Sequence, residues 1–358
     1  MPLISHFSFI SYHISSAMDI PVLDFSNFAN GSQTQQDDFC RRLYASLSSL
    51  GFVKIRNHSI PDDVLDQVFD WSKRFFGMPL EDKLQAAHPI KPNPHRGWSC
   101  VGQEKLSVIR QGKAVFDLKE SFDQGPASDT LYPNIFPPDT ILPGFRPFME
   151  SFYTHCQTLH LNLLSAIALS LSLEPTFFIP RCGTNSSELR LNHYPATKAS
   201  LLETGESMRI SSHTDFGTIT LLFQDAVGGL EVESQERDGV YIPVLPSEAE
   251  AGRGRDMIVN VGDCLQRWTN DRLRSANHRV TLPVGMKVED SSSTTTNTTT
   301  STGVVEVPDR YSIAYFGKPD REALVAAIPE LVGEGELLRY EGAMTAWEYN
   351  QSRLLQTY

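Results

Sequence analysis

Two ionisable residues of the segment "RISSHTDFGTITLLFQ", His213 and Asp215, stand two positions apart in a run rich in β-formers. Side chains alternate along a strand, so we expect both to share one face. One imidazole and one carboxylate are two of the three ligands of a facial metal site. His278, at the start of a β-like run after a turn-rich segment, is the best third ligand. This set suits non-haem Fe(II), although a zinc hydrolase with a metal-bound water uses similar ligands.

An arginine and a serine, Arg310 and Ser312, share one face of another predicted strand, "DRYSIAYF". A buried arginine is costly unless it meets an anion, and its planar fork matches a carboxylate, to which a serine hydroxyl can add a hydrogen bond. The alternative is an exposed arginine that pairs with a surface neighbour. Alternation also lets three residues of "ELRLNHYP" face one pocket, namely Arg190, Asn192 and Tyr194.

Two groups of elements must position these residues. The first part of the chain alternates short strands with amphipathic helices, and a long helix is predicted from about 147 to 173. Several short β-rich runs separated by Gly, Asp, Asn and Pro follow, as is typical of an antiparallel sandwich or jelly roll, with "MIVNVGDCLQRWTN" as a strand pair. The Ser/Thr tract at 289–303 is too polar to order itself, and "MTAWEYNQSRLLQ" is predicted to be helical.

Composition excludes several classes of protein. The 358 residues carry a net charge of -12 with a pI of about 5.3, which argues against nucleic-acid binding and against anionic membranes. Five scattered cysteines without a CxxC pair argue against disulfides and thiolate zinc sites, and indicate a reducing compartment. No apolar run is long enough to span a bilayer. We expect a cytoplasmic monomer with a disordered extension at 1–17, and Met18, which follows it, is an alternative start.

The motifs H-T-D, H-R-V and R-Y-S, in this order, resemble the Fe(II)/2-oxoglutarate-dependent dioxygenases of the isopenicillin N synthase-like group, of the fungal natural-product type. The resemblance covers nearly the whole chain, because "IPVLDF", "GFVKIRNHSI" and "KESFDQG" resemble the N-terminal region of that group. It implies an α+β fold: a double-stranded β-helix (jelly-roll) core flanked by helices, with an N-terminal α/β region. The expected regions are 18–140 (N-terminal), 141–180 (supporting helix), 184–320 (oxygenase core) and 321–358 (C-terminal helical segment).

The resemblance also implies roles for individual residues and a reaction. The implied iron ligands are His213, Asp215 and His278. The implied 2-oxoglutarate contacts are Arg310, Ser312, Asn192 and Tyr194. The candidate substrate contacts are Arg190, Phe216, His95 and Trp98.

The implied reaction uses Fe(II), 2-oxoglutarate and O2, with ascorbate as an aid in vitro. It couples decarboxylation of 2-oxoglutarate to succinate and CO2 with oxidation of a small secondary-metabolite intermediate, by hydroxylation, desaturation or ring rearrangement. Two alternatives stay open at this point: an Fe(II) oxidase of the same fold that does not use 2-oxoglutarate, and a non-catalytic jelly-roll binding protein.

One spacing departs from the pattern of the group. His278 and Arg310 are 32 positions apart (310 minus 278), and the Ser/Thr tract lies between them. Because a loop insertion costs little closure entropy, we expect the site to survive it, and we expect the two segments that flank the tract to pair with each other as one hairpin.

Overall fold

The computed structural model describes residues 20–89, 94–103, 117–204, 207–246, 256–286 and 305–355. The expected disordered segments at 1–17 and 289–303 lie outside these residues and stay predictions. Within the described ranges, no helix is long and apolar enough to cross a membrane.

The N-terminal region combines short strands with helices that have clear end signals. A capping box between Ser32 and Gln35 starts α2, and Asp62 and Asp63 stand in the first turn of α3, where the helix dipole favours them. Pro61 is the N-cap of α3. The elements are β1 (Val22–Asp24), α1 (Ser26–Ala29), α2 (Gln33–Ser49), β2 (Phe52–Arg56), α3 (Asp62–Phe76), α4 (Leu80–Leu84), β3 (Gly97–Ser99), β4 (Glu120–Gln124) and α6 (Phe145–Ser170).

The rest of the chain supplies the predicted β-rich core. Its elements are η1 (Ile179–Arg181), β5 (Glu188–Tyr194), β6 (Thr197–Lys198), α7 (Ala199–Glu203), β7 (Ile210–His213), β8 (Ile219–Gln224), β9 (Leu230–Glu233), β10 (Tyr241–Pro243), β11 (Met257–Val261), α8 (Asp263–Trp268), β12 (His278–Val280), β13 (Glu306–Val307), β14 (Arg310–Phe316), η2 (Pro329–Leu331) and α9 (Ala346–Leu354).

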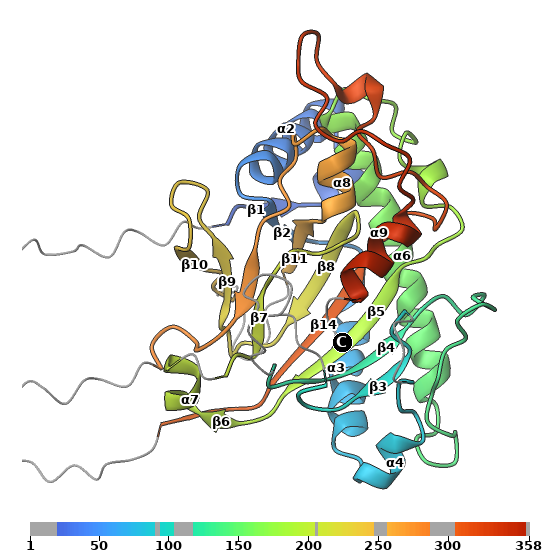
Figure 1. Ribbon diagram of the computed structural model, residues 1–358, viewed down its shortest axis with the longest axis vertical. Helices are drawn as coiled ribbons and strands as arrows, with labels where there is room; N and C mark the ends of the chain where they lie inside the picture. The colour runs from blue at the N-terminus through green and yellow to red at the C-terminus, as the bar shows by residue number, and fades with distance from the viewer. Residues whose placement is uncertain are drawn as a thin grey trace, which may run out of the picture.

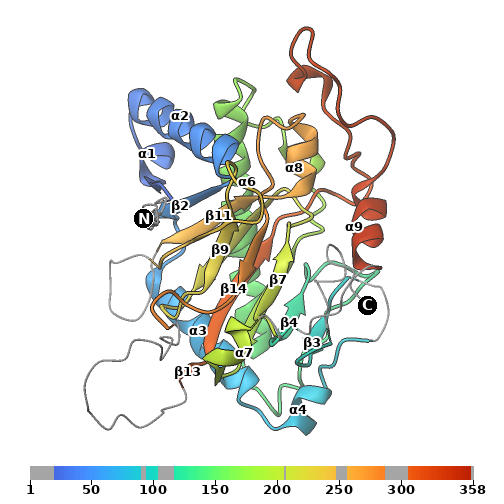
Figure 2. The same cartoon turned by 60° about the vertical axis from the view of Figure 1, so that its left-hand side comes forward.

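The strands form a large and a small sheet. The larger has the order β1-β2-β11-β8-β14-β5-β4-β3 and the smaller has the order β10-β9-β12-β7, while β13 and β6 form a separate pair. The smaller sheet lies across one face of the larger one (Figure 1 and Figure 2). The N-terminal strands extend the larger sheet on both sides, because β1 and β2 join β11, and β4 and β3 join β5. The predicted jelly-roll core with an N-terminal α/β region is therefore confirmed.

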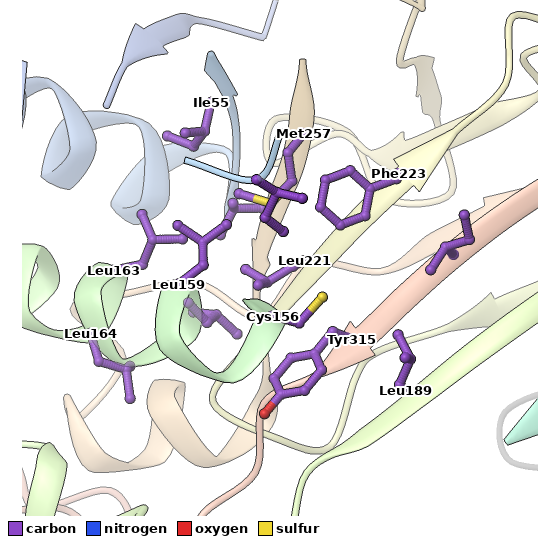
Figure 3. Close-up of a cluster of buried hydrophobic side chains, with 14 of the residues drawn as sticks. Ile55, Cys156, Leu159, Leu163, Leu164, Leu189, Leu221, Phe223, Met257 and Tyr315 are labelled. Carbon is purple, nitrogen blue, oxygen red and sulfur yellow. The ribbon is translucent and has the colours of Figure 1, made fainter. Parts of the chain in front are cut away.

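The long helix α6 covers the other face of the larger sheet. Its buried side chains, among them Cys156, Leu159 and Leu163, point toward Leu221 and Met257 of the sheet (Figure 3). Burial of this apolar surface stabilises the strands of the larger sheet, which carry part of the candidate site.

Three local predictions were wrong. β7 ends at His213, so Asp215 lies in the following loop and not on a strand. "MIVNVGDCLQRWTN" forms strand β11 and helix α8, because Gly262 interrupts the strand and the hydrogen bonds of α8 begin there. β12 and β14 do not form a hairpin, since they belong to different sheets and pair with other strands.

Candidate functional site

The three expected metal ligands lie together at one end of strands β7 and β12 of the smaller sheet. His213 ends β7, His278 begins β12, and the two residues are direct partners in the antiparallel register. The Nε2 atom of each imidazole lies 3.8 Å from Oδ1 of Asp215. One donor atom from each of the three residues lies within 4.8 Å of the others, so together they can hold one metal ion.

Hydrogen bonds fix which ring nitrogen each histidine offers. Nδ1 of His213 lies 2.8 Å from the carbonyl oxygen of Ser211, and Nδ1 of His278 lies 3.1 Å from that of Ala276. A carbonyl oxygen only accepts, so each Nδ1 carries the proton and each Nε2 presents a lone pair to the site. Burial, followed by the neighbouring His278, lowers the pKa of His213, which keeps it neutral, as a metal ligand must be.

Asp215 is held by two residues that sequence analysis missed. Its Oδ2 accepts hydrogen bonds from Thr220 Oγ1 at 2.6 Å and from Asn260 Nδ2 at 2.7 Å. These two residues are direct partners across β8 and β11. Burial would raise the pKa of Asp215, but the two imidazoles and these hydrogen bonds outweigh burial and lower it. Asn260 could have been found as a lone polar residue in a buried apolar strand.

The expected anion site lies across three neighbouring strands of the larger sheet. Arg310 pairs in register with Tyr194, and Ser312 pairs with Asn192 on one side and Gln224 on the other. The Arg310 guanidinium is fully buried, donates to Gln224 Oε1 at 2.8 Å, and lies 4.7 Å from the centre of the Tyr194 ring. Its Nε and Oδ1 of Asn192 have no hydrogen-bond partner among the described residues. Buried polar atoms without partners are rare, so this cluster fits a bound anion.

An open cavity lies beside the three expected ligands, and His213 and Asp215 form part of its wall; its empty space, including the part open to solvent, is about 630 Å³. Three of the four candidate substrate residues, Arg190, Phe216 and His95, line the same cavity, so the structure brings them next to the expected metal ligands. Further lining residues are Glu188, Thr214, Gly217, Phe316, Lys318, Asn350 and Leu354.

Trp98 is the exception among the candidate substrate residues. It is buried in the core and donates from Nε1 to Glu120 Oε2 at 2.7 Å, and it is not among the described residues that line the cavity.

Charged residues of both signs stand on the cavity wall. Arg190 donates to Asp123 at 2.6 Å and to Nδ1 of His95 at 2.6 Å, so it pairs with a buried carboxylate and also lines the cavity. Glu188 and Lys318, which sequence analysis missed, form an ion pair at 2.6 Å. Burial would raise the pKa of Glu188, but its cationic neighbours lower it to about 2, so it stays anionic.

The C-terminal helix α9 closes one side of the cavity through Asn350 and Leu354. A capping box at Thr345 starts this helix, and the hydroxyl of Tyr349 donates to Asp263 at 2.6 Å, which ties it to α8. The loop between β7 and β8, which also lines the cavity, has no room for a side chain at Gly217. A Cβ atom there would lie 2.2 Å from the carbonyl oxygen of Gly317.

Comparison with known proteins shows which proteins this chain resembles. Residues 20–139 match the family model of the non-haem dioxygenase in morphine synthesis N-terminal region, and residues 185–319 match that of the 2OG-Fe(II) oxygenase superfamily. The proline hydroxylase buaE of Petromyces alliaceus is 60% identical over 95% of this chain and 100% of its own length. The 2-oxoglutarate-dependent dioxygenase frbA of Dothideomycetidae sp. (strain 11243) is 49% identical over 95% of this chain and 98% of its own. Among solved structures, a full-length Neurospora crassa protein in complex with alpha-KG has 34% identity and a TM-score of 0.79, covering 94% of this chain and 96% of that one.

Proposed function

Since this chain belongs to the 2OG-Fe(II) oxygenase superfamily, we propose that His213, Asp215 and His278 hold its Fe(II) and that its substrate is proline or a closely similar amino acid. The reaction class follows from the family: the enzyme couples decarboxylation of 2-oxoglutarate to oxidation of a small organic molecule. The donor set supports the metal assignment, because two neutral imidazoles and one carboxylate on one side leave other positions open. When bound there, the iron supplies the redox chemistry that activates O2.

The far carboxylate of 2-oxoglutarate is proposed to lie on Arg310, with Ser312, Asn192 and Tyr194 around it. The buried Nε of Arg310 and Oδ1 of Asn192, both without partners among the described residues, support this assignment. The cross-strand register sets these side chains on one patch, so the co-substrate meets a preformed site.

The substrate assignment rests on one observation in the chain itself: the cavity beside the ligands carries Arg190 and Lys318 as cations and Glu188 as an anion. An amino acid bears one carboxylate and one ammonium, which match charges of this kind. Phe216 and Phe316 line the same space and give an apolar wall for a saturated ring. The relative that is 60% identical is a proline hydroxylase, which supports the same class of substrate.

The chain's own residues have defined tasks in this reaction. Glu188 and Arg190 orient the substrate, while Phe216 and α9 narrow the space around the reacting C–H bond and exclude water. Asp215 keeps its orientation because Thr220 and Asn260 hold its second oxygen.

The test is to incubate the enzyme with Fe(II), 2-oxoglutarate, O2 and L-proline, and to measure succinate and the oxygenated product by mass spectrometry. We expect proline to gain one oxygen atom with about one succinate formed per product. Arg190→Lys should raise the KM for proline and leave the KM for 2-oxoglutarate unchanged. Succinate formation that L-proline and its ring analogues do not stimulate would reject the substrate assignment and leave the reaction class intact.

We also propose that the enzyme is a cytoplasmic monomer whose oxygenase core is residues 184–320, preceded by regions 18–140 and 141–180 and followed by 321–358. Light scattering of the purified protein tests the monomeric state.

A further inference from the structure

A second fully buried arginine, Arg209, stands beside the expected anion site. Arg209 and Arg310 each have no exposed surface. Their guanidinium carbons lie 6.0 Å and 4.7 Å from the centre of the same Tyr194 ring. Arg209 precedes β7 by one residue and has no part in the function proposed above.

The hydrogen-bonding groups of Arg209 are mostly unused. Its Nη2 donates to the carbonyl oxygen of Pro308, while its Nε and Nη1 have no acceptor among the described residues. Arg310 likewise leaves its Nε without a partner. Within the described part of the chain, neither guanidinium forms an ion pair with a carboxylate.

Two buried cations at one ring carry a high electrostatic cost. Burial, followed by the charge of Arg310, lowers the pKa of Arg209 to about 10. The carboxylates of Asp225 and Asp309 raise the pKa of Arg209 but are engaged elsewhere: Asp225 accepts from the backbone N–H of Tyr311, and Asp309 accepts from that of Ala196. The cluster therefore lacks an anion that could accept hydrogen bonds from both guanidiniums.

We propose that Arg209 is a second cation for the far carboxylate of 2-oxoglutarate, acting beside Arg310. This inference rests on the proposed placement of that carboxylate at Arg310. In this role Arg209 would contact the far carboxylate and none of the reacting atoms. It would therefore contribute to the affinity for the co-substrate and to its selection. Its presence favours a 2-oxo acid that ends in a carboxylate over one that ends in a methyl group.

The experiment measures binding by calorimetry on protein loaded with Mn(II) in place of Fe(II), without turnover. The ligands are 2-oxoglutarate and 2-oxopentanoate, which has the same chain length but no far carboxylate. Arg209→Met should weaken 2-oxoglutarate about tenfold or more, as expected for a lost charge-assisted hydrogen bond, and leave 2-oxopentanoate unchanged. The exposed Arg146→Met serves as the control and should change neither.

A structural role for Arg209 predicts a different pattern, because both ligands would then weaken together or neither would. Either result overturns the inference. The metal-free Arg209→Met protein should melt no lower than the wild type, since a buried charge without an anion is removed. If this variant does not fold, Arg209→Lys keeps the charge but loses the fork, and should weaken 2-oxoglutarate alone. Equal affinities in Arg209→Lys and wild type overturn the inference as well.

The same assay separates this inference from the proposed function. If Arg310→Met abolishes the preference for 2-oxoglutarate and Arg209→Met keeps it, the inference fails and the proposed carboxylate site stands. If Arg310→Met keeps the preference, the placement of the carboxylate itself is wrong.

Discussion

Thr220→Val is the substitution that most sharply tests how the metal site is built. The side chains are nearly the same size, so the change removes one hydrogen bond at 2.6 Å to Oδ2 of Asp215 and little else. Asn260 then remains as the single side-chain donor to that oxygen among the described residues. A hydrogen bond to a buried charged group contributes about 1.5–3 kcal/mol, and about 1.4 kcal/mol corresponds to a tenfold change in affinity. We therefore expect the metal affinity to fall by about 10- to 100-fold, as for other groups that orient a metal ligand.

The assay is calorimetric titration of the metal-free protein with Mn(II) or Fe(II) under anaerobic conditions. Thr218→Val is the matched control, because its hydroxyl donates to the carbonyl oxygen of Gly317 and makes no contact with Asp215. The control should lower the melting temperature without changing the metal affinity. Equal metal affinities in Thr220→Val and the wild type would refute the reasoning that this hydrogen bond orients the ligand.

Three further predictions concern the cavity and its wall. Phe216→Ala enlarges the cavity, so the ratio of succinate to oxygenated product should rise as turnover becomes uncoupled, and an unchanged ratio would contradict its role as a wall. The Glu188 carboxylate, with its pKa lowered from 4.5 to about 2, stabilises the fold above about pH 4.5 and loses this effect as the pH falls toward 2. Urea unfolding at pH 7 and pH 3 should therefore show a larger loss of free energy of unfolding in the wild type than in Glu188→Gln, by about 2 kcal/mol of the roughly 3 kcal/mol that the full shift represents. Tyr349→Phe removes the hydrogen bond to Asp263, so limited proteolysis should cut near α9 faster than in the wild type, and equal rates would reject this tie.

Much of the fold could be predicted because local sequence patterns and tertiary structure agree. Apolar periodicity placed α6 within a few residues of its observed bounds, and alternation in "DRYSIAYF" matched β14. The order of strands in the two sheets could not be predicted, because long-range pairing leaves no local signal. For the same reason the hairpin expected between β12 and β14 was wrong: short strands at this spacing fit a crossover between sheets equally well.

For the site, motif spacing predicted the residues but not all of their geometry. Strand alternation correctly predicted that Asp215 lies beside His213. The reason was wrong, because Asp215 stands in the loop after β7 and not on the strand. Thr220 and Asn260 escaped notice because a supporting hydrogen bond depends on the pairing of β8 with β11. Glu188 and Lys318 meet only because β5 and β14 are neighbours.

The central claim is that His213, Asp215 and His278 hold the iron that drives 2-oxoglutarate-dependent oxidation. The most direct measurement adds Fe(II) and then 2-oxoglutarate to wild-type protein and to Asp215→Ala under anaerobic conditions, and records the visible spectrum before O2 and substrate are admitted. We predict a weak visible charge-transfer band and subsequent succinate formation in the wild type, and neither in the variant. A folded Asp215→Ala protein that still shows the band and forms succinate at the wild-type rate would contradict the account.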